Sequence, residues 1–164
     1  MRGVRQRRWR IVDLCTRAGV ADAMQDGKAQ PALGLLRAEF GFSLVEAGWV
    51  GSVLSATAAA IGVLAGSLSD RLGDRRTIAF CLLMIVLGNL MGAFAQSGNA
   101  LLFSRFIEGI GFVGVVVSVP GIIIRVTTAA DQRLAFGFWG AYMPFGMALM
   151  MAVAPLLLAP VGWR

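Results

Sequence analysis

The sequence predicts an all-α membrane protein with about four transmembrane helices. The 164-residue chain is 57% hydrophobic and only 15% charged, whereas soluble domains carry about 25% charged residues. Its uncharged stretches reach the roughly 20 residues that a helix needs to cross a bilayer. These stretches are continuous and rich in Ala, Leu, Gly and Met. They lack the alternation of apolar and polar residues that marks the strands of an outer-membrane barrel, so helices are predicted.

Four segments are long enough to span a bilayer. The first lies in an uncharged run of 23 residues from Ala47 to Ser69. The third contains two charged residues, Arg105 and Glu108. Because the turns between the segments are short, helices that follow one another are expected to be antiparallel neighbours. We place the spans at about 45–69, 77–97, 100–125 and 134–158.

Basic residues predict the orientation of these spans. The loops at 70–76 and 125–133 carry arginines and the loop at 96–99 carries none, so the positive-inside tendency places the first two in the cytoplasm. The segment 1–37, with eight Lys and Arg residues, then falls on the outer side, which conflicts with the same tendency. One more helix before residue 44 would resolve the conflict, but charges recur too often within 11–40 to predict one.

Residues 1–30 form a basic segment that we expect to be disordered, followed by the main domain at 31–164. The net charge is +6, but the basic residues flank apolar runs and form no aromatic-basic stripe, so no nucleic-acid partner is predicted. Cys15 and Cys81 stand alone and histidine is absent, which predicts neither a disulfide nor a metal site. The sequence has no phosphate-binding loop and no nucleophile–base constellation, so neither a cofactor nor an enzymatic activity is expected.

Small and aromatic residues predict how the spans pack. The pairs Gly62-x-x-x-Gly66 and Gly88-x-x-x-Gly92 are typical of faces on which helices approach closely. Four aromatic residues fall near the ends of spans, as expected of a belt at the membrane surface: Trp49, Trp139, Tyr142 and Trp163.

The loop GSLSDRLGDRR at 66–76 places glycine, aspartate and arginine at fixed spacing. Gly66 would let the end of a helix pack closely on a neighbour, and Gly73 would permit a tight reversal with a positive φ. Asp70 at a helix end can pair with an arginine or with the amino end of another helix. Orientation alone would explain the arginines, but not the spacing of the glycines and the aspartate.

That spacing, GxxxDRxGxRR, resembles the loop between the second and third helices of the major facilitator superfamily of secondary transporters. Asp74 stands where the family often has a basic residue. The resemblance implies a gating loop, in which the aspartate meets a helix in the second half of the transporter and stabilises the state open to the outside. The residues that match are Gly66, Asp70, Arg71, Gly73, Arg75 and Arg76.

A second motif, LLFSRFIEGIGF at 101–112, places two opposite charges inside the third span. Arg105 and Glu108 are three residues apart and therefore share one face of a helix. A single charge at the centre of a membrane helix costs about 2.5–3.5 kcal/mol on insertion scales. An opposite charge one turn away therefore indicates that the two side chains pair. Two interpretations stay open: a structural pair that packs helices, and an anion-binding or proton-coupling site that faces a central cavity.

The same motif resembles the RxxxGxG of the superfamily's fourth helix, matched by Arg105, Gly109 and Gly111. Glu108 and the VVVSVPGIII that follows resemble the cyanate-type branch of these transporters. We therefore take Arg105, Glu108, Gly109 and Gly111 as candidates for cavity or coupling residues. The span at 134–158 lacks the Gly-Pro doublet and spaced glycines of proton-coupled drug antiporters, which favours uptake of a small anion or metabolite over drug export.

The resemblance implies secondary active transport of a small solute by a multi-pass protein, expected in a bacterial inner membrane. It covers residues 31–164, through the fifth helix of a twelve-helix family. We therefore expect a truncated amino-terminal portion that does not transport by itself and that pairs with the missing helices on another chain. Two alternatives stay open: a compact four-helix exporter that works as a dimer, and a membrane protein that only packs with a partner.

Overall fold

The computed structural model describes residues 2–161, and within that range the chain forms helices joined by short turns, without strands. Side chains at 2–5, 68, 70, 72, 74–75 and 159–161 lie outside the description. The all-α prediction is confirmed. The helices are α1 (Arg2–Gly27), α2 (Ala29–Phe40), α3 (Leu44–Leu72), α4 (Asp74–Ala93), α5 (Gly98–Val126), α6 (Ala129–Gly140) and α7 (Tyr142–Val161).

Four stretches of the described chain are long and apolar enough to cross a membrane, which is the predicted number. The fourth combines α6 and α7, which are separated only by Ala141. α6 ends at Gly140, four residues before Pro144, whose ring crowds the carbonyl of Gly140 and offers it no N–H. The four stretches are Leu44–Ser67, Arg76–Ala93, Gly98–Val126 and Ala129–Leu158.

The amino-terminal segment differs from its prediction, because the part described here is helical rather than disordered. α1 and α2 follow one another through Lys28 alone, which keeps helical dihedrals (φ −71°, ψ −27°). α1 likewise ends four residues before a proline, Pro31, which removes a hydrogen bond to the carbonyl of Gly27. The two helices therefore act as one kinked helix, and Lys28 marks the bend.

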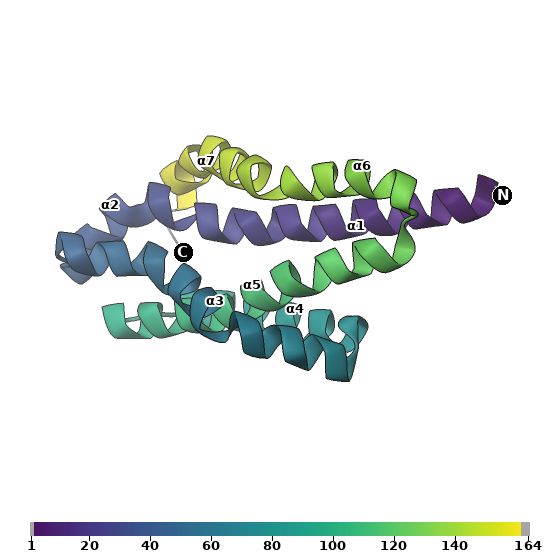
Figure 1. The fold of residues 1–164 in the computed structure, drawn as a ribbon. Coiled ribbons are helices and arrows are strands. Elements are labelled where there is room, and N and C mark those ends of the chain that lie inside the picture. The colour runs from purple at the N-terminus through teal and green to yellow at the C-terminus, as the bar shows by residue number, and fades with distance from the viewer. Residues whose placement is uncertain (1, 162–164) are drawn as a thin grey trace.

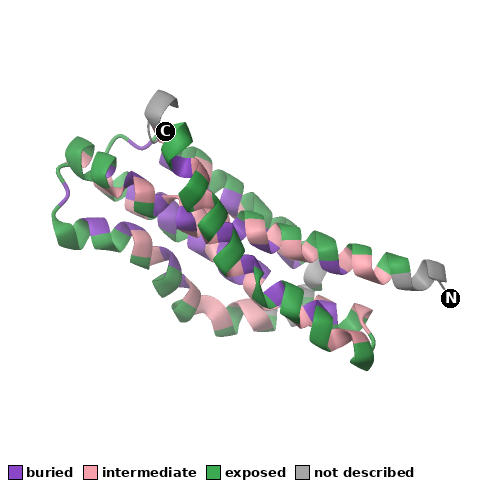
Figure 2. Cartoon of the chain, turned by 90° about the horizontal axis from the view of Figure 1, so that it is seen from above, coloured by how far each residue is buried: buried purple, intermediate pink, exposed green. Residues whose placement is uncertain are grey.

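α1 lies inside the bundle, with α6 and α7 along one side and α5 on the other (Figure 1). By length and composition the candidate membrane spans of the described chain do not include α1 or α2, in keeping with the expectation for 11–40, but the bundle does contain both helices. α5 is the central element, because α3 and α4 both pack against it. Its apolar stretch is 56% buried, against 17–28% for the other three spans. Burial concentrates between the helices, while their outer faces are exposed and apolar (Figure 2).

Glycines let α4 approach α5 closely, which confirms the packing role predicted for Gly88-x-x-x-Gly92. A Cβ added at Gly88 would lie 2.5 Å from Cγ of Glu108 and 2.9 Å from the carbonyl oxygen of Ser104. A Cβ at Gly92 would lie 3.0 Å from Oγ of Ser104. The contacts of Gly62 and Gly66 with α5 are looser, since an added Cβ would make only ordinary contact at 3.8 and 3.5 Å.

Two aromatic residues of the predicted belt, Trp139 of α6 and Tyr142 of α7, pack inside the bundle rather than at a membrane surface. Trp139 and Tyr142 are both 7% exposed, and their rings stack with centroids 4.1 Å apart. A Cβ added at Gly19 of α1 would lie 2.6 Å from Cζ3 of Trp139. These two residues thus form the α1 interface, which corrects their assignment to a surface belt. Trp49 is half exposed, and Trp163 lies outside the described residues.

Replacing Gly88 with alanine is expected to lower the free energy of unfolding by about 1–3 kcal/mol, because the new methyl group would force α4 away from α5. Thermal unfolding in detergent micelles measures the change. Gly51→Ala is the matched control, since a Cβ there meets no atom within 4 Å, and its stability should be unchanged or slightly higher. Equal stability of the two variants would contradict the close α4–α5 contact.

Candidate functional site

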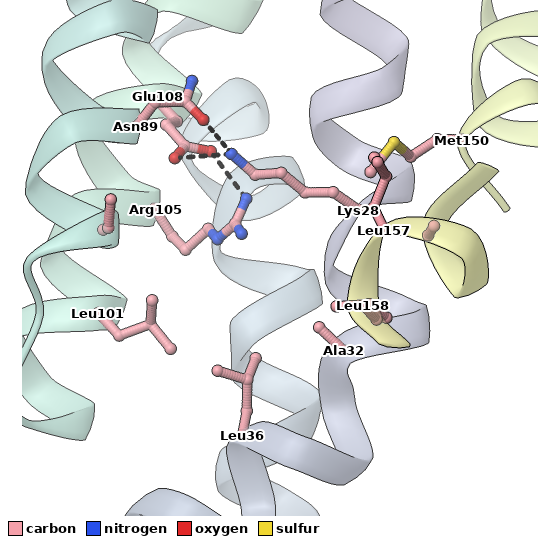
Figure 3. A pocket seen from close by; sticks show the side chains of 13 residues that line it. Lys28, Ala32, Leu36, Asn89, Leu101, Arg105, Glu108, Met150, Leu157 and Leu158 are labelled. Atoms are coloured by element: carbon pink, nitrogen blue, oxygen red, sulfur yellow. Dashed lines mark hydrogen bonds and ion pairs between the residues drawn. The ribbon is translucent and has the colours of Figure 1, made fainter. Parts of the chain in front are cut away.

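A cavity of about 340 Å³ lies between the α1–α2 kink, α4, α5 and α7 (Figure 3). Most of its wall is apolar, and its polar side chains come from three different parts of the chain. The apolar lining is Ala32, Leu36, Gly92, Ala93, Leu101, Met150, Ala154, Leu157 and Leu158. The polar lining is Lys28, Asn89, Arg105 and Glu108.

Glu108 is the centre of the polar group, and its side chain is 2% exposed. One carboxylate oxygen accepts a hydrogen bond from Nη1 of Arg105 at 2.7 Å. The other accepts from Nζ of Lys28 at 3.2 Å. Because both cations are charged donors, these are hydrogen bonds of the stronger kind. Lys28, Arg105 and Glu108 together are called the ion cluster below.

Local structure orients the side chain of each member of the ion cluster. Arg105 and Glu108 lie three residues apart on α5 and so face the same way. Lys28 sits at the kink and donates to Oε1 of Gln25 at 2.7 Å and to Oδ1 of Asn89. Asn89 in turn donates from Nδ2 to the carbonyl of Ile85 at 2.8 Å, which turns its acceptor oxygen toward the lysine. Figure 3 shows Lys28 reaching across to α4 and α5.

The charged groups that line the cavity leave one positive charge in excess, since two cations face one carboxylate. Arg105 also keeps spare donors: Nη1 reaches the carbonyl of Gln25 at 3.4 Å, and its buried Nε has no partner among the described residues. Asp26 lies within electrostatic range of Arg105, but it lines a different hollow that faces α3. The cavity wall can therefore attract and hydrogen-bond an anion.

The four predicted cavity residues separate into two groups. Arg105 and Glu108 line the cavity, whereas Gly109 and Gly111 do not. A Cβ added at Gly109 would lie 2.8 Å from Cβ of Thr57 on α3, and one at Gly111 would lie 2.5 Å from the carbonyl of Cys81 on α4. In this structure the two glycines hold α5 against its neighbours.

Lys28 and Asn89 line the site but were not predicted from the sequence. Lys28 was counted among the basic residues of a segment expected to be disordered, and Asn89 lies in an otherwise apolar span. A polar residue inside a membrane span is itself a signal of a functional or paired position. That signal was available at Asn89, which lies between Gly88 and Gly92 of the predicted packing face.

The 66–76 loop forms a tight reversal between α3 and α4. Gly73 has φ +82°, which confirms the predicted positive φ, and its N–H donates to the carbonyl of Ser69 at 3.0 Å. Arg71 and Arg76 are exposed. The side chains of Asp70 and Arg75 lie outside the described part of the chain. The close packing expected at Gly66 is not required by the structure, because its neighbour Val117 is at ordinary contact distance.

Comparison with known sequences shows which family this chain belongs to. The sequence profile of the Major Facilitator Superfamily matches residues 18–164. The chain belongs to the Major Facilitator Superfamily. The profile begins twelve residues before residue 30, so the later part of the segment expected to lie outside the family is in fact part of its match.

The relatives of this Major Facilitator chain are named for different solutes. A probable 4-methylmuconolactone transporter of Cupriavidus pinatubonensis is 33% identical over 138 residues, which are 82% of this chain and 32% of the relative. The putative niacin/nicotinamide transporter NiaP of Bacillus subtilis is 28% identical over 148 residues (87% and 36%). The cyanate transport protein CynX of Escherichia coli is 28% identical over 127 residues (77% and 33%). The chain thus spans about a third of the length of these relatives.

Replacing Glu108 with glutamine is expected to lower the free energy of unfolding by about 3–5 kcal/mol, because it leaves two buried cations without their carboxylate. Thermal or denaturant unfolding in micelles measures the loss. Adding Lys28→Met to this variant should recover part of it, since one of the stranded cations is then gone.

The matched control for Glu108→Gln is Asp13→Asn, which breaks the exposed pair with Arg17 on α1. That pair should contribute less than about 1 kcal/mol. If Glu108→Gln is no more destabilising than this control, the ion cluster does not carry the role given to it here.

Proposed function

We propose that this chain supplies amino-terminal helices of a secondary active transporter that moves a small anionic solute. Membership of the superfamily supports the transport class. The excess positive charge on the cavity wall, carried by Lys28 and Arg105 against Glu108, is the observation that supports an anion. An unbalanced charge in such a place is costly unless a counter-ion arrives, and the solute supplies one.

The rest of the cavity wall narrows the class of solute. Its other lining residues are mostly Leu, Ala and Met, which suit an apolar body. The proposed solute therefore has one anionic group and a small apolar part. Two relatives are named for anions, cyanate and sulfoacetate, the latter a probable transporter of Cupriavidus necator that is 26% identical over 130 residues.

Each member of the ion cluster has a proposed role. Arg105 binds the anionic group through donors that Glu108 does not use, and Lys28 supplies the second positive charge. Glu108 holds both cations when no solute is present, so that neither is stranded in the bundle. The 66–76 loop is proposed to gate the transporter, with Asp70 and the arginines Arg71, Arg75 and Arg76 meeting helices that this chain does not contain.

We also propose that the α1–α2 kinked helix crosses the membrane. Its 26 and 12 residues, at 1.5 Å each, exceed the thickness of a bilayer core. Its charged residues near the middle lie in the bundle interior: Asp22 is buried and Lys28 meets Glu108. This helix puts the basic amino terminus on the same side as the loops at 70–76 and 125–133. That side is then the cytoplasm of a bacterial inner membrane.

A comparison of nicotinate with its neutral amide, nicotinamide, tests the preference for anions. The chain in lipid nanodiscs should bind nicotinate about tenfold more tightly, a difference of about 1.4 kcal/mol. Side-chain ¹⁵N resonances of Arg105 and Lys28 should shift with nicotinate, while that of exposed Arg37 should not. The Arg105→Gln variant should bind nicotinate with an affinity as low as that for nicotinamide. Equal affinity of the two ligands for the unchanged chain would overturn the anionic preference.

These 164 residues are proposed not to transport by themselves, because they match only about a third of the length of relatives with named transport functions. Proteoliposomes that contain only this chain should take up no more radiolabelled nicotinate or cyanate than empty liposomes. Co-reconstitution with the carboxy-terminal half of a relative provides the partner helices. Robust uptake by the chain alone would instead support a compact transporter that works as a dimer.

A further inference from the structure

The amino-terminal end of α1 carries arginines that the cavity does not use. Residues 1–12 contain five arginines and no acidic residue. Arg7 and Arg10 are exposed and Arg8 is half-buried. Within the described part of the chain these three take part in no ion pair. We call Arg7, Arg8 and Arg10 the arginine tip, and its three positive charges are available to a partner outside the chain.

Packing of α1 against the bundle fixes which way the arginine tip faces. Val12 is 2% exposed in the core, and the ring of Trp9 meets that of Phe138 on α6 edge-on, with centroids 6.3 Å apart. Arg7, Arg10 and Leu14 are spaced three and four residues apart, so they share the other face of the helix. Leu14 is 65% exposed. The outward strip of α1 is therefore basic at its end and apolar one turn further in.

The spacing along this strip matches the layers of a membrane surface. The end of α1 extends past the turn that joins α5 to α6 (Figure 1). An exposed Leu14 suits contact with hydrocarbon, and Arg10 and Arg7 begin about 6 and 10 Å further out, at 1.5 Å per residue. The polar headgroup layer is about 5–8 Å thick on each side of the bilayer core. Arg17 lies deeper on the same face and is already paired with Asp13 at 3.0 Å, so the arginine tip supplies the unpaired charge at this layer.

The chemistry of the arginine tip suits a phosphate group. All the basic residues of 1–12 are arginines, and a planar guanidinium group can donate two parallel hydrogen bonds to phosphate oxygens. Clusters of four to eight basic residues beside a membrane helix attract anionic lipids, and each residue near the surface strengthens binding by about fivefold.

We propose that the arginine tip binds the phosphate group of an anionic lipid in the leaflet that faces the cytoplasm. Arg7 and Arg10 hold the phosphate from the exposed face of α1, and Arg8 adds positive charge beside them. The contact of Trp9 with Phe138 keeps this end of the helix against the bundle. The inference rests on the proposed crossing of the membrane by the α1–α2 kinked helix. It assigns a lipid partner to a segment that has no part in binding the solute.

Native mass spectrometry of the chain in detergent micelles tests the proposal, because it counts the lipid molecules that stay bound to the protein. The unchanged chain should bind phosphatidylglycerol about tenfold more tightly than the zwitterionic phosphatidylcholine. The variant Arg7→Gln/Arg8→Gln/Arg10→Gln should bind phosphatidylglycerol about 100-fold more weakly, at about fivefold for each arginine removed. Equal affinity of the unchanged chain for the two lipids would overturn the proposal.

The matched control is Arg71→Gln/Arg76→Gln/Arg133→Gln, which removes the same charge from exposed positions on the same side of the bundle. It should bind phosphatidylglycerol as tightly as the unchanged chain, and circular dichroism should show equal helix content in both variants. An equal loss of binding in the control would show that lipid follows total charge and that the arginine tip is no site.

Inorganic phosphate in excess separates the two sources of a phosphate group. It should not displace the bound phosphatidylglycerol, and displacement would show a site for free phosphate and contradict the lipid assignment. The measurement uses neither nicotinate nor transport. Failure of lipid binding therefore leaves the anionic cavity standing, and failure of nicotinate binding leaves the lipid site standing.

Discussion

The need to balance charge inside an apolar bundle organises this structure. Glu108 is almost fully buried, and two cations reach it, one from its own helix and one from the α1–α2 kink. Close approach of α4 depends on Gly88, which lies against Glu108 itself. The kink depends on Pro31, and it is Lys28 at the bend that completes the cluster. A change in any of these features would leave a charge inside the bundle without its partner.

The features that follow from local rules could be predicted from the sequence. Length and hydropathy identify the four apolar spans, because the bilayer imposes a minimum length on any helix that crosses it. The spacing of Arg105 and Glu108 predicts their pairing, since residues three apart share a helical face. The positive φ of Gly73 follows from a reversal between two long helices with one residue to spare. The resemblance of the 66–76 loop to the Major Facilitator Superfamily points to the family that the profile match shows.

The role of the amino-terminal helix could not be predicted in the same way. Its many charged residues predict a solvated or disordered segment, because a sequence pattern does not show which charged side chains will pair with residues elsewhere in the chain. The partners of Lys28 lie 61 and 80 residues further along the chain. For the same reason Gly109 and Gly111, part of a motif that suggests a cavity, turn out to face Thr57 and Cys81 on neighbouring helices. Burial of Trp139 and Tyr142 likewise depends on α1 being present beside them.

The contact between Lys28 and Glu108 is the most direct test of this account, because it joins the helix that the sequence did not predict to the centre of the cavity. Solid-state NMR on the chain in lipid, with ¹⁵N in the lysine side chain and ¹³C in the glutamate carboxyl, measures the dipolar coupling between them. The account predicts a strong coupling, in keeping with an Nζ–Oε1 distance of 3.2 Å, and its loss in Lys28→Met. Absence of the coupling in the unchanged chain would contradict the placement of α1–α2 inside the bundle.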